Sequence, residues 1–117
     1  NQTLMAVAAA IHLSWLGPQG LRDVGRACAS KASYAAERLT AIDGVELVFP
    51  EAPFFKEFAL RLPRGASGVR DALVDRGYLA GVPLTDLDAN VLLVAVTERR
   101  TREEIDAFAR AMGEVLA

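Results

Sequence analysis

Charged residues gather where an apolar run ends, in the stretch VTERRTREEID at residues 96–106. Arg99 and Arg100 can bind a carboxylate through paired hydrogen bonds, because a guanidinium presents two parallel N–H donors. Residues that follow a strand often line a cleft, which makes residues 97–100 candidates for a binding corner. A solvated corner is the simpler interpretation, and the residues alone leave both open.

Two further side chains carry reactive groups. A histidine can act as an acid or a base, but His12 lies in an apolar helix with no carboxylate within one turn, which favours a packing or interface role. Cys28 lies on an apolar helical stripe, where a thiol is inert. One cysteine cannot form an internal disulfide, and one cysteine with one histidine cannot supply a structural zinc site. We expect neither residue to be catalytic and expect no metal site.

The remaining polar motifs have structural explanations. RGASG, residues 64–68, has the wrong glycine spacing for a nucleotide loop and reads as the entry to a helix, although a helix N-terminus can hold an anion. Thr101 and Glu104 predict a capping box, and acidic residues suit the positive end of a helix dipole. Asp86 and Asp88 are turn formers. None of these motifs requires catalysis.

Periodicity and turn residues predict the elements that position these groups. Gly17 ends a first helix, Pro18 opens a second helix, and Gly44 terminates it. Ser67 is the predicted N-cap of a third helix that Gly77 stops. The sequence predicts strands at residues 45–49, 54–62 and 91–96, a short edge strand within residues 78–84, and a last helix after Thr101.

Helices and strands do not alternate strictly in this order, so the predicted class is α+β. We expect a mostly antiparallel sheet of three to four strands with helices on one face. Residues 1–117 form a single domain in this prediction. It divides into long linking helices at residues 1–43 and an α+β sheet lobe at residues 44–117.

The first predicted helix is apolar almost all round, with Leu4, Ala8, Ile11 and Trp15 at helical spacing. Such a helix is normally buried on several sides. It is either the central helix of this domain or a helix that packs on a region outside the given sequence. An exposed apolar face would favour dimers of the fragment.

Composition excludes several functional classes. Apolar residues make up 52% of the 117 residues, charged residues 24%, and the net charge of −2 is scattered along the chain. A nucleic-acid surface would need a basic excess on one face. The apolar run at residues 4–16 is shorter than the about 20 residues that span a bilayer. The chain opens at Asn1 almost inside a helix, so we expect a piece of a longer chain. A single cysteine gives an oxidising compartment no support, and we expect a cytoplasmic protein with no membrane contact.

Several motifs in order resemble a known family. The stretches NQTLMAVAAAIHLSWLGPQGLRDVG, GVELVF, PFFKEFALRLP, LVDRGYLAGVPL and LLVAVTERRTREEID are similar to the C-terminal end of subunit 1 of bacterial glycine dehydrogenase (decarboxylating), the P-protein of the glycine cleavage system. The resemblance covers essentially the whole chain. FFKEF, GVPL and VTE..T.EEID are its most specific parts.

The resemblance implies a fold and an activity. The fold is the small C-terminal domain of a fold-type-I pyridoxal-phosphate (PLP) transferase. The reaction is glycine decarboxylation with aminomethyl transfer to the lipoyl group of the lipoylated H-protein, in a heterotetramer with glycine dehydrogenase subunit 2. The PLP lysine belongs to subunit 2 in two-subunit versions, so we expect an inactive fragment with a supporting role.

The resemblance also implies approximate site positions. Neither Lys31 nor Lys56 matches the Schiff-base lysine, so no catalytic residue is assigned. Asn1 and Gln2 are placed near the cofactor of the partner subunit, and Thr97 and Glu98 on the cleft side of the small domain. The alternatives are the small domain of another fold-type-I enzyme, such as an aminotransferase or cysteine desulfurase, and a free-standing α+β binding or regulatory module.

Overall fold

The computed structural model describes all residues, 1–117, as three helices and a four-stranded sheet. The elements follow the order α1, β1, β2, α2, β3, β4, α3. Their bounds are α1 Gln2–Thr40, β1 Glu46–Leu47, β2 Glu57–Arg61, α2 Ala66–Val74, β3 Val82–Pro83, β4 Val91–Ala95 and α3 Arg102–Leu116. The observed strands are shorter than the predicted ones, since only these residues pair across the sheet.

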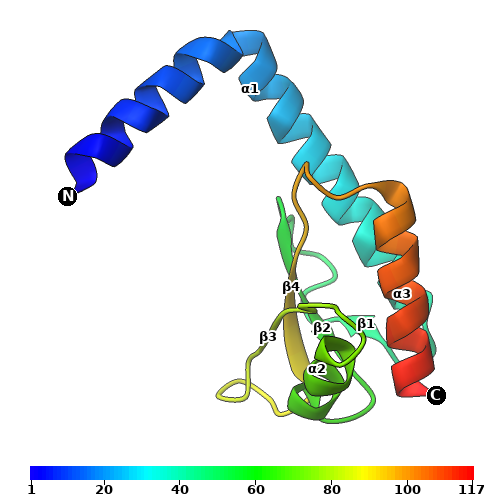
Figure 1. Cartoon of the computed structure of the whole chain (residues 1–117). Coiled ribbons are helices and arrows are strands. Elements are labelled where there is room, and N and C mark those ends of the chain that lie inside the picture. Colours follow the sequence, from blue (N-terminus) through cyan, green and yellow to red (C-terminus); the bar gives the residue numbers. More distant parts are fainter.

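The two predicted N-terminal helices form one kinked helix, α1. Gly17 breaks the helical geometry with φ 66° and ψ 177°, and Pro18 restarts the helix. A positive φ costs glycine little, and proline suits a first helical turn because its missing N–H has no partner there. Figure 1 shows the result, in which residues 2–16 project from the body as an arm. The segment from Pro18 to Thr40, the stem, descends onto the body.

The sheet has the strand order β1-β2-β4-β3, and every pair is antiparallel. The pairing places Phe58 opposite Val94 and Leu60 opposite Leu92. These four side chains belong to one buried cluster together with residues of all three helices, so the helices cover one face. This confirms the predicted α+β class and the predicted place of β4 inside the sheet.

The core lies between this face and the helices. Its largest fully buried side chains include Leu39 of α1, Leu60, Leu73 of α2, Leu92 and Met112 of α3. At about 25 cal/mol per Å² of apolar surface, each such side chain contributes roughly 1.5–3 kcal/mol on burial. The C-terminal half of the stem therefore shares the core with the sheet lobe. The packing continues across the predicted boundary at residue 43 between the linking helices and the sheet lobe.

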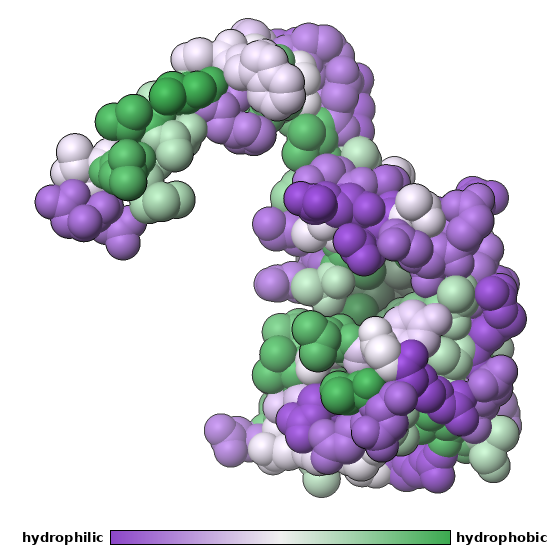
Figure 2. Space-filling view, in the orientation of Figure 1, coloured by the Kyte–Doolittle hydropathy of each residue, from purple (hydrophilic) through white to green (hydrophobic).

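The arm is exposed up to Trp15, so the interpretation as a central helix is wrong. Trp15 is 82% exposed, and the other large apolar side chains before it are also exposed, whereas Leu16, next to the kink, is half-buried. Figure 2 shows them as an apolar surface on the projecting helix. The kink directs the arm away from the body, so none of its side chains reaches the core.

By length and composition alone, α1 is also apolar enough to cross a membrane. The kink at Gly17 divides it, however, and the apolar segment before the kink is shorter than the about 20 residues that a bilayer requires. The stem after the kink packs in the core. The arm by itself is therefore too short to span a bilayer.

The start of α2 differs from the prediction. The N-cap is Gly65, without a side-chain hydrogen bond, and Ser67 lies inside the helix, so the predicted Ser67 cap is wrong. The Ala66 N–H donates to the Ala89 carbonyl, and the Ala66 side chain is fully buried. This tertiary anchor starts the helix before Ser67.

The predicted C-terminal end of α2 and the predicted start of α3 are confirmed. Gly77 adopts φ 87°, its N–H donates to Val74, and the Tyr78 N–H donates to Leu73, which together form a Schellman motif. Thr101 and Glu104 form the reciprocal capping box at the start of α3. By contrast, α1 ends at Thr40, before the predicted stop at Gly44. Gly44 takes a positive φ in the turn that follows the helix.

Candidate functional site

The chain leaves β4 beside the middle of α1, in the loop of residues 96–101 (Figure 1). Thr97 and Glu98, the residues predicted for the cleft side, are half-buried, whereas Arg99 and Arg100 are exposed. The Arg99 N–H donates to Thr97 Oγ1 at 3.4 Å, which closes a tight turn. Thr97 and Glu98 are therefore the partly covered residues of this loop, and the two arginines are its solvent-exposed residues.

Glu98 is fixed by two residues of the stem. The Cys28 thiol donates to Glu98 Oε2 at 3.3 Å, and Lys31 Nζ donates to the Glu98 backbone carbonyl. The Cys28 bond is the main cause that lowers the pKa of the Glu98 carboxyl, followed by its own backbone N–H, while partial burial opposes the shift. Arg99 and Lys56 lower this pKa further through their charge. The simpler prediction of a solvated corner is therefore wrong for Glu98.

A second polar cluster joins the stem to α3. The Tyr34 hydroxyl and the Arg38 guanidinium both donate to Asp106 Oδ1 at 2.8 Å. The Tyr34 bond is the main cause that lowers the pKa of Asp106, and the same bond raises the pKa of Tyr34. Arg102 lies over the Tyr34 ring, with 4.5 Å between its Cζ and the ring centroid. This cluster fixes the stem against α3 through charge-assisted bonds.

An apolar cavity of about 480 Å³ opens between the end of β4, α3 and the loop after α2. Its lining includes the rings of Tyr78 and Phe108, which are tilted by 43° with their centroids 5.6 Å apart. Arg100 and Glu104, an ion pair at 3.6 Å, lie among its polar residues. Leu79, which is 94% exposed, also lines the cavity. The cavity is suited to apolar groups and carries no nucleophile or metal-binding cluster.

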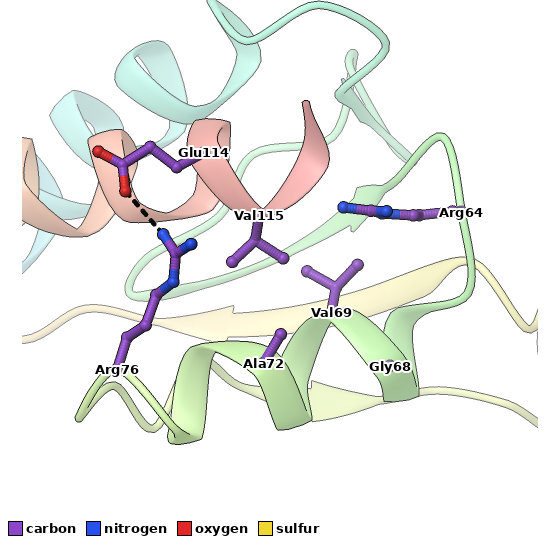
Figure 3. Close-up of a pocket in the computed structure, with 7 residues that line it drawn as sticks. All are labelled: Arg64, Gly68, Val69, Ala72, Arg76, Glu114 and Val115. Atoms are coloured by element: carbon purple, nitrogen blue, oxygen red, sulfur yellow. Dashed lines mark hydrogen bonds and ion pairs between the residues drawn. The ribbon is translucent and has the colours of Figure 1, made fainter.

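A smaller cavity of about 310 Å³ lies between α2 and α3 (Figure 3). Arg76 donates to Glu114 at 2.7 Å across it, and Arg64 reaches into it from the loop before α2. The Arg76 guanidinium is thus neutralised by a neighbouring carboxylate. The cavity is a polar seam between two packed helices.

Asn1 and Gln2, the residues predicted near the partner's cofactor, lie exposed at the far end of the arm. Asn1 Oδ1 accepts a hydrogen bond from the Thr3 N–H at 2.9 Å, so Asn1 caps α1. The arm separates this pair from Thr97 and Glu98, and the chain does not bring the two pairs together. Their roles at a cofactor or a cleft stay predictions.

Sequence reasoning missed the partners of the loop. Cys28 and Lys31 are three residues apart and so project from one side of a helix, but the tertiary fold alone shows that this side faces Glu98. The same holds for Tyr34 and Arg38, which are four residues apart and meet Asp106. In the sequence, these contacts were indicated only by polar residues that lie one helical turn from the apolar residues of the stem.

The comparison with known families decides the classification. The family model described as "Glycine cleavage system P-protein" matches residues 1–112 of this chain. The chain belongs to the glycine cleavage system P-protein family. This confirms the family resemblance and favours it over the small domain of an aminotransferase or a cysteine desulfurase.

Curated relatives within the P-protein family are similar over nearly the whole chain. Proteins named "Probable glycine dehydrogenase (decarboxylating) subunit 1" are 49% identical in Methylococcus capsulatus, 46% in Chlorobium limicola and 43% in Aeropyrum pernix. The matches cover 99%, 96% and 99% of this chain. They cover 26%, 25% and 26% of the relatives, so the chain spans about a quarter of their length.

Solved structures support the P-protein fold. The crystal structure of glycine decarboxylase (P-protein) of the glycine cleavage system, in inhibitor-bound form, matches with a TM-score of 0.93 and 38% identity. The match covers 99% of this chain and 26% of that chain. A NifS-like protein matches with a TM-score of 0.71 at 17% identity over 84% of this chain and 29% of its own, and this likeness concerns the fold alone. The chain therefore has the small-domain fold of fold-type-I PLP enzymes.

Proposed function

We propose that this chain is the C-terminal lobe of subunit 1 of glycine dehydrogenase (decarboxylating). The proposed enzyme decarboxylates glycine and transfers the aminomethyl group to the lipoyl group of H-protein. The match of the P-protein family model to residues 1–112 is the observation that carries the proposal. The 38% identity to a solved P-protein, at a TM-score of 0.93, supports it.

The proposed role of the lobe is supportive. Pyridoxal phosphate, when bound to such an enzyme, supplies the electron sink for decarboxylation and is held by a lysine. Lys31 donates to the Glu98 carbonyl, Lys56 is exposed at the sheet end, and neither lines either main cavity. These residues do not fit a Schiff-base site. We assign the cofactor lysine to subunit 2, within a cytoplasmic heterotetramer.

The exposed arm supports a place within such an assembly. Six large apolar side chains lie exposed on it, namely Leu4, Met5, Val7, Ile11, Leu13 and Trp15. A contiguous apolar surface of this kind marks a contact with another protein part. In the proposed enzyme, the remainder of the two-subunit assembly covers the arm. The stem connects the arm to the sheet lobe, because it packs in the core of that lobe.

The assignment is tested with a complete subunit 1 that contains this segment and with its subunit 2. We expect glycine–bicarbonate exchange when both are mixed and none from either alone. Subunit 1 with Ile11→Asp should lose assembly and exchange together, because a carboxylate would be buried in an apolar contact. Ser14→Asp, an equal charge at an exposed polar arm residue, is the matched control. A coloured Schiff base formed by subunit 1 alone with pyridoxal phosphate would contradict the supporting role.

A further inference from the structure

Three cationic side chains gather around Glu98 at one end of the sheet. Lys31 reaches it from the stem and donates to its backbone carbonyl. The Val96 N–H donates to the Lys56 carbonyl at 2.8 Å, which sets Lys56 opposite Val96, two residues before Glu98. Arg99 follows Glu98 directly. The only two lysines of the sequence thus lie near Glu98, Lys31 at its backbone carbonyl and Lys56 close enough for its charge to act on the carboxylate.

The electrostatic surroundings of Glu98 agree with this placement. The charges that act on its carboxylate are those of Arg99 and Lys56, and both lower its pKa. No second acid contributes to that shift. The group therefore holds three cations and one carboxylate in a chain whose net charge is −2.

These cations are not neutralised within the chain. Six arginines form ion pairs with carboxylates, whereas Lys31, Lys56 and Arg99 form none. The Glu98 carboxylate is itself engaged by the Cys28 thiol. Lys56 and Arg99 are exposed, so their charged groups are accessible to a partner.

We propose that Lys31, Lys56 and Arg99 form a docking surface for an acidic protein segment, with Glu98 held on the stem as the group that spaces them. An arginine fork binds a carboxylate in a bidentate way and a lysine adds a point charge. A segment with several carboxylates fits better than a small anion, because neither main cavity includes these three residues and a single anion would stay in water. This surface does not depend on the proposed enzyme activity.

The surface is tested by titrating the 117-residue chain into a fluorescently labelled glutamate-rich peptide and measuring anisotropy. We expect saturable binding that weakens as salt increases. The double variant Lys56→Ala/Arg99→Ala should weaken binding roughly tenfold, the effect of losing two exposed charge pairs. Arg64→Ala/Arg110→Ala removes the same charge at exposed, unpaired arginines elsewhere. It should weaken binding of the peptide only by the small effect of the changed net charge, and therefore less than Lys56→Ala/Arg99→Ala.

Glu98→Gln provides a test of opposite sign. Removing the central negative charge should tighten binding of the peptide, although it weakens the contact with Cys28. Equal losses in the two double variants would show nonspecific attraction and overturn the proposal. So would displacement by inorganic phosphate without any binding of the peptide, because that result would indicate a small-anion site.

Discussion

The Cys28 thiol lies 3.3 Å from Glu98 Oε2 and joins two residues that are 70 positions apart in the sequence. The contact ties the stem of α1 to the loop that leaves the central strand. It also couples the position of this loop to the ionisation of Glu98. The pKa of Glu98 is lowered, so the folded chain favours its carboxylate form.

Removing the thiol should alter the ionisation of Glu98. In Cys28→Ala the largest cause of the lowered pKa disappears, so the pKa of Glu98 should rise toward its ordinary value. Cys28→Ser keeps a donor at the same place and should largely preserve the lowered pKa. Carboxyl-carbon NMR titration measures both, with Glu98→Gln to assign the resonance. An unchanged titration in the alanine variant would show that the thiol contact is absent in solution.

The Asp106 cluster should make stability depend on pH in acid. The folded pKa of Asp106 is lowered, so its contribution is complete above the ordinary Asp value of about 3.9 and is lost as pH falls through the lowered pKa. Asp106→Asn should reduce stability at neutral pH and flatten this acid dependence. Thermal unfolding across a pH series measures both effects. A parallel curve for wild type and variant would contradict the coupling.

The same substitution should lower the pKa of Tyr34. Its hydrogen bond to Asp106 is the largest cause that raises this pKa, and Asn in place of Asp removes the negative charge as well. Tyrosinate absorbance in an alkaline titration reports the change. A Tyr78→Phe background leaves Tyr34 as the only tyrosine that titrates.

Gly81 should be the glycine least tolerant of substitution. Its φ is 148°, and an added Cβ would lie 2.2 Å from the Leu93 carbonyl oxygen. Gly81→Ala should therefore disturb the β3–β4 pairing and cost about 1–3 kcal/mol in the free energy of unfolding. Gly25→Ala, at a helical site with no atom within 4 Å, should instead stabilise by about 0.5–1 kcal/mol. Urea unfolding of both variants gives the comparison, and similar values would refute the close approach.

Leucine truncation should separate the body from the arm. Leu60 is fully buried, so Leu60→Ala should cost about 2–5 kcal/mol through a cavity in the core. Leu4 is 73% exposed, so Leu4→Ala should change the free energy of unfolding by less than about 0.5 kcal/mol. Chemical denaturation of the isolated chain measures both. A large loss from Leu4→Ala would mean that the arm folds back onto the body.

The isolated chain should self-associate through its arm. The exposed apolar side chains favour dimers, since burying them removes apolar surface from water. Sedimentation at micromolar concentrations should show an increase in mass with concentration, and Ile11→Asp should abolish it. A concentration-independent monomer would rule out this association.

Local patterns in the sequence determined most of the elements. The capping box at Thr101, the Gly77 stop and the break at Gly17 depend on backbone chemistry within a few residues, so each could be predicted without the fold. The α+β class followed from the order of these elements. The family followed from motifs such as FFKEF and GVPL, which the family model confirms.

Tertiary structure alone decided three features. Ala66 starts α2 in place of the Ser67 cap, because its N–H finds the Ala89 carbonyl on another segment. The apolar arm lies exposed, because the kink turns it away from the core that the sheet and the rest of the helices form. The clusters around Glu98 and Asp106 join residues about 70 positions apart. Periodicity identifies the face of a helix that is buried, but the partner of that face depends on how distant elements pack together.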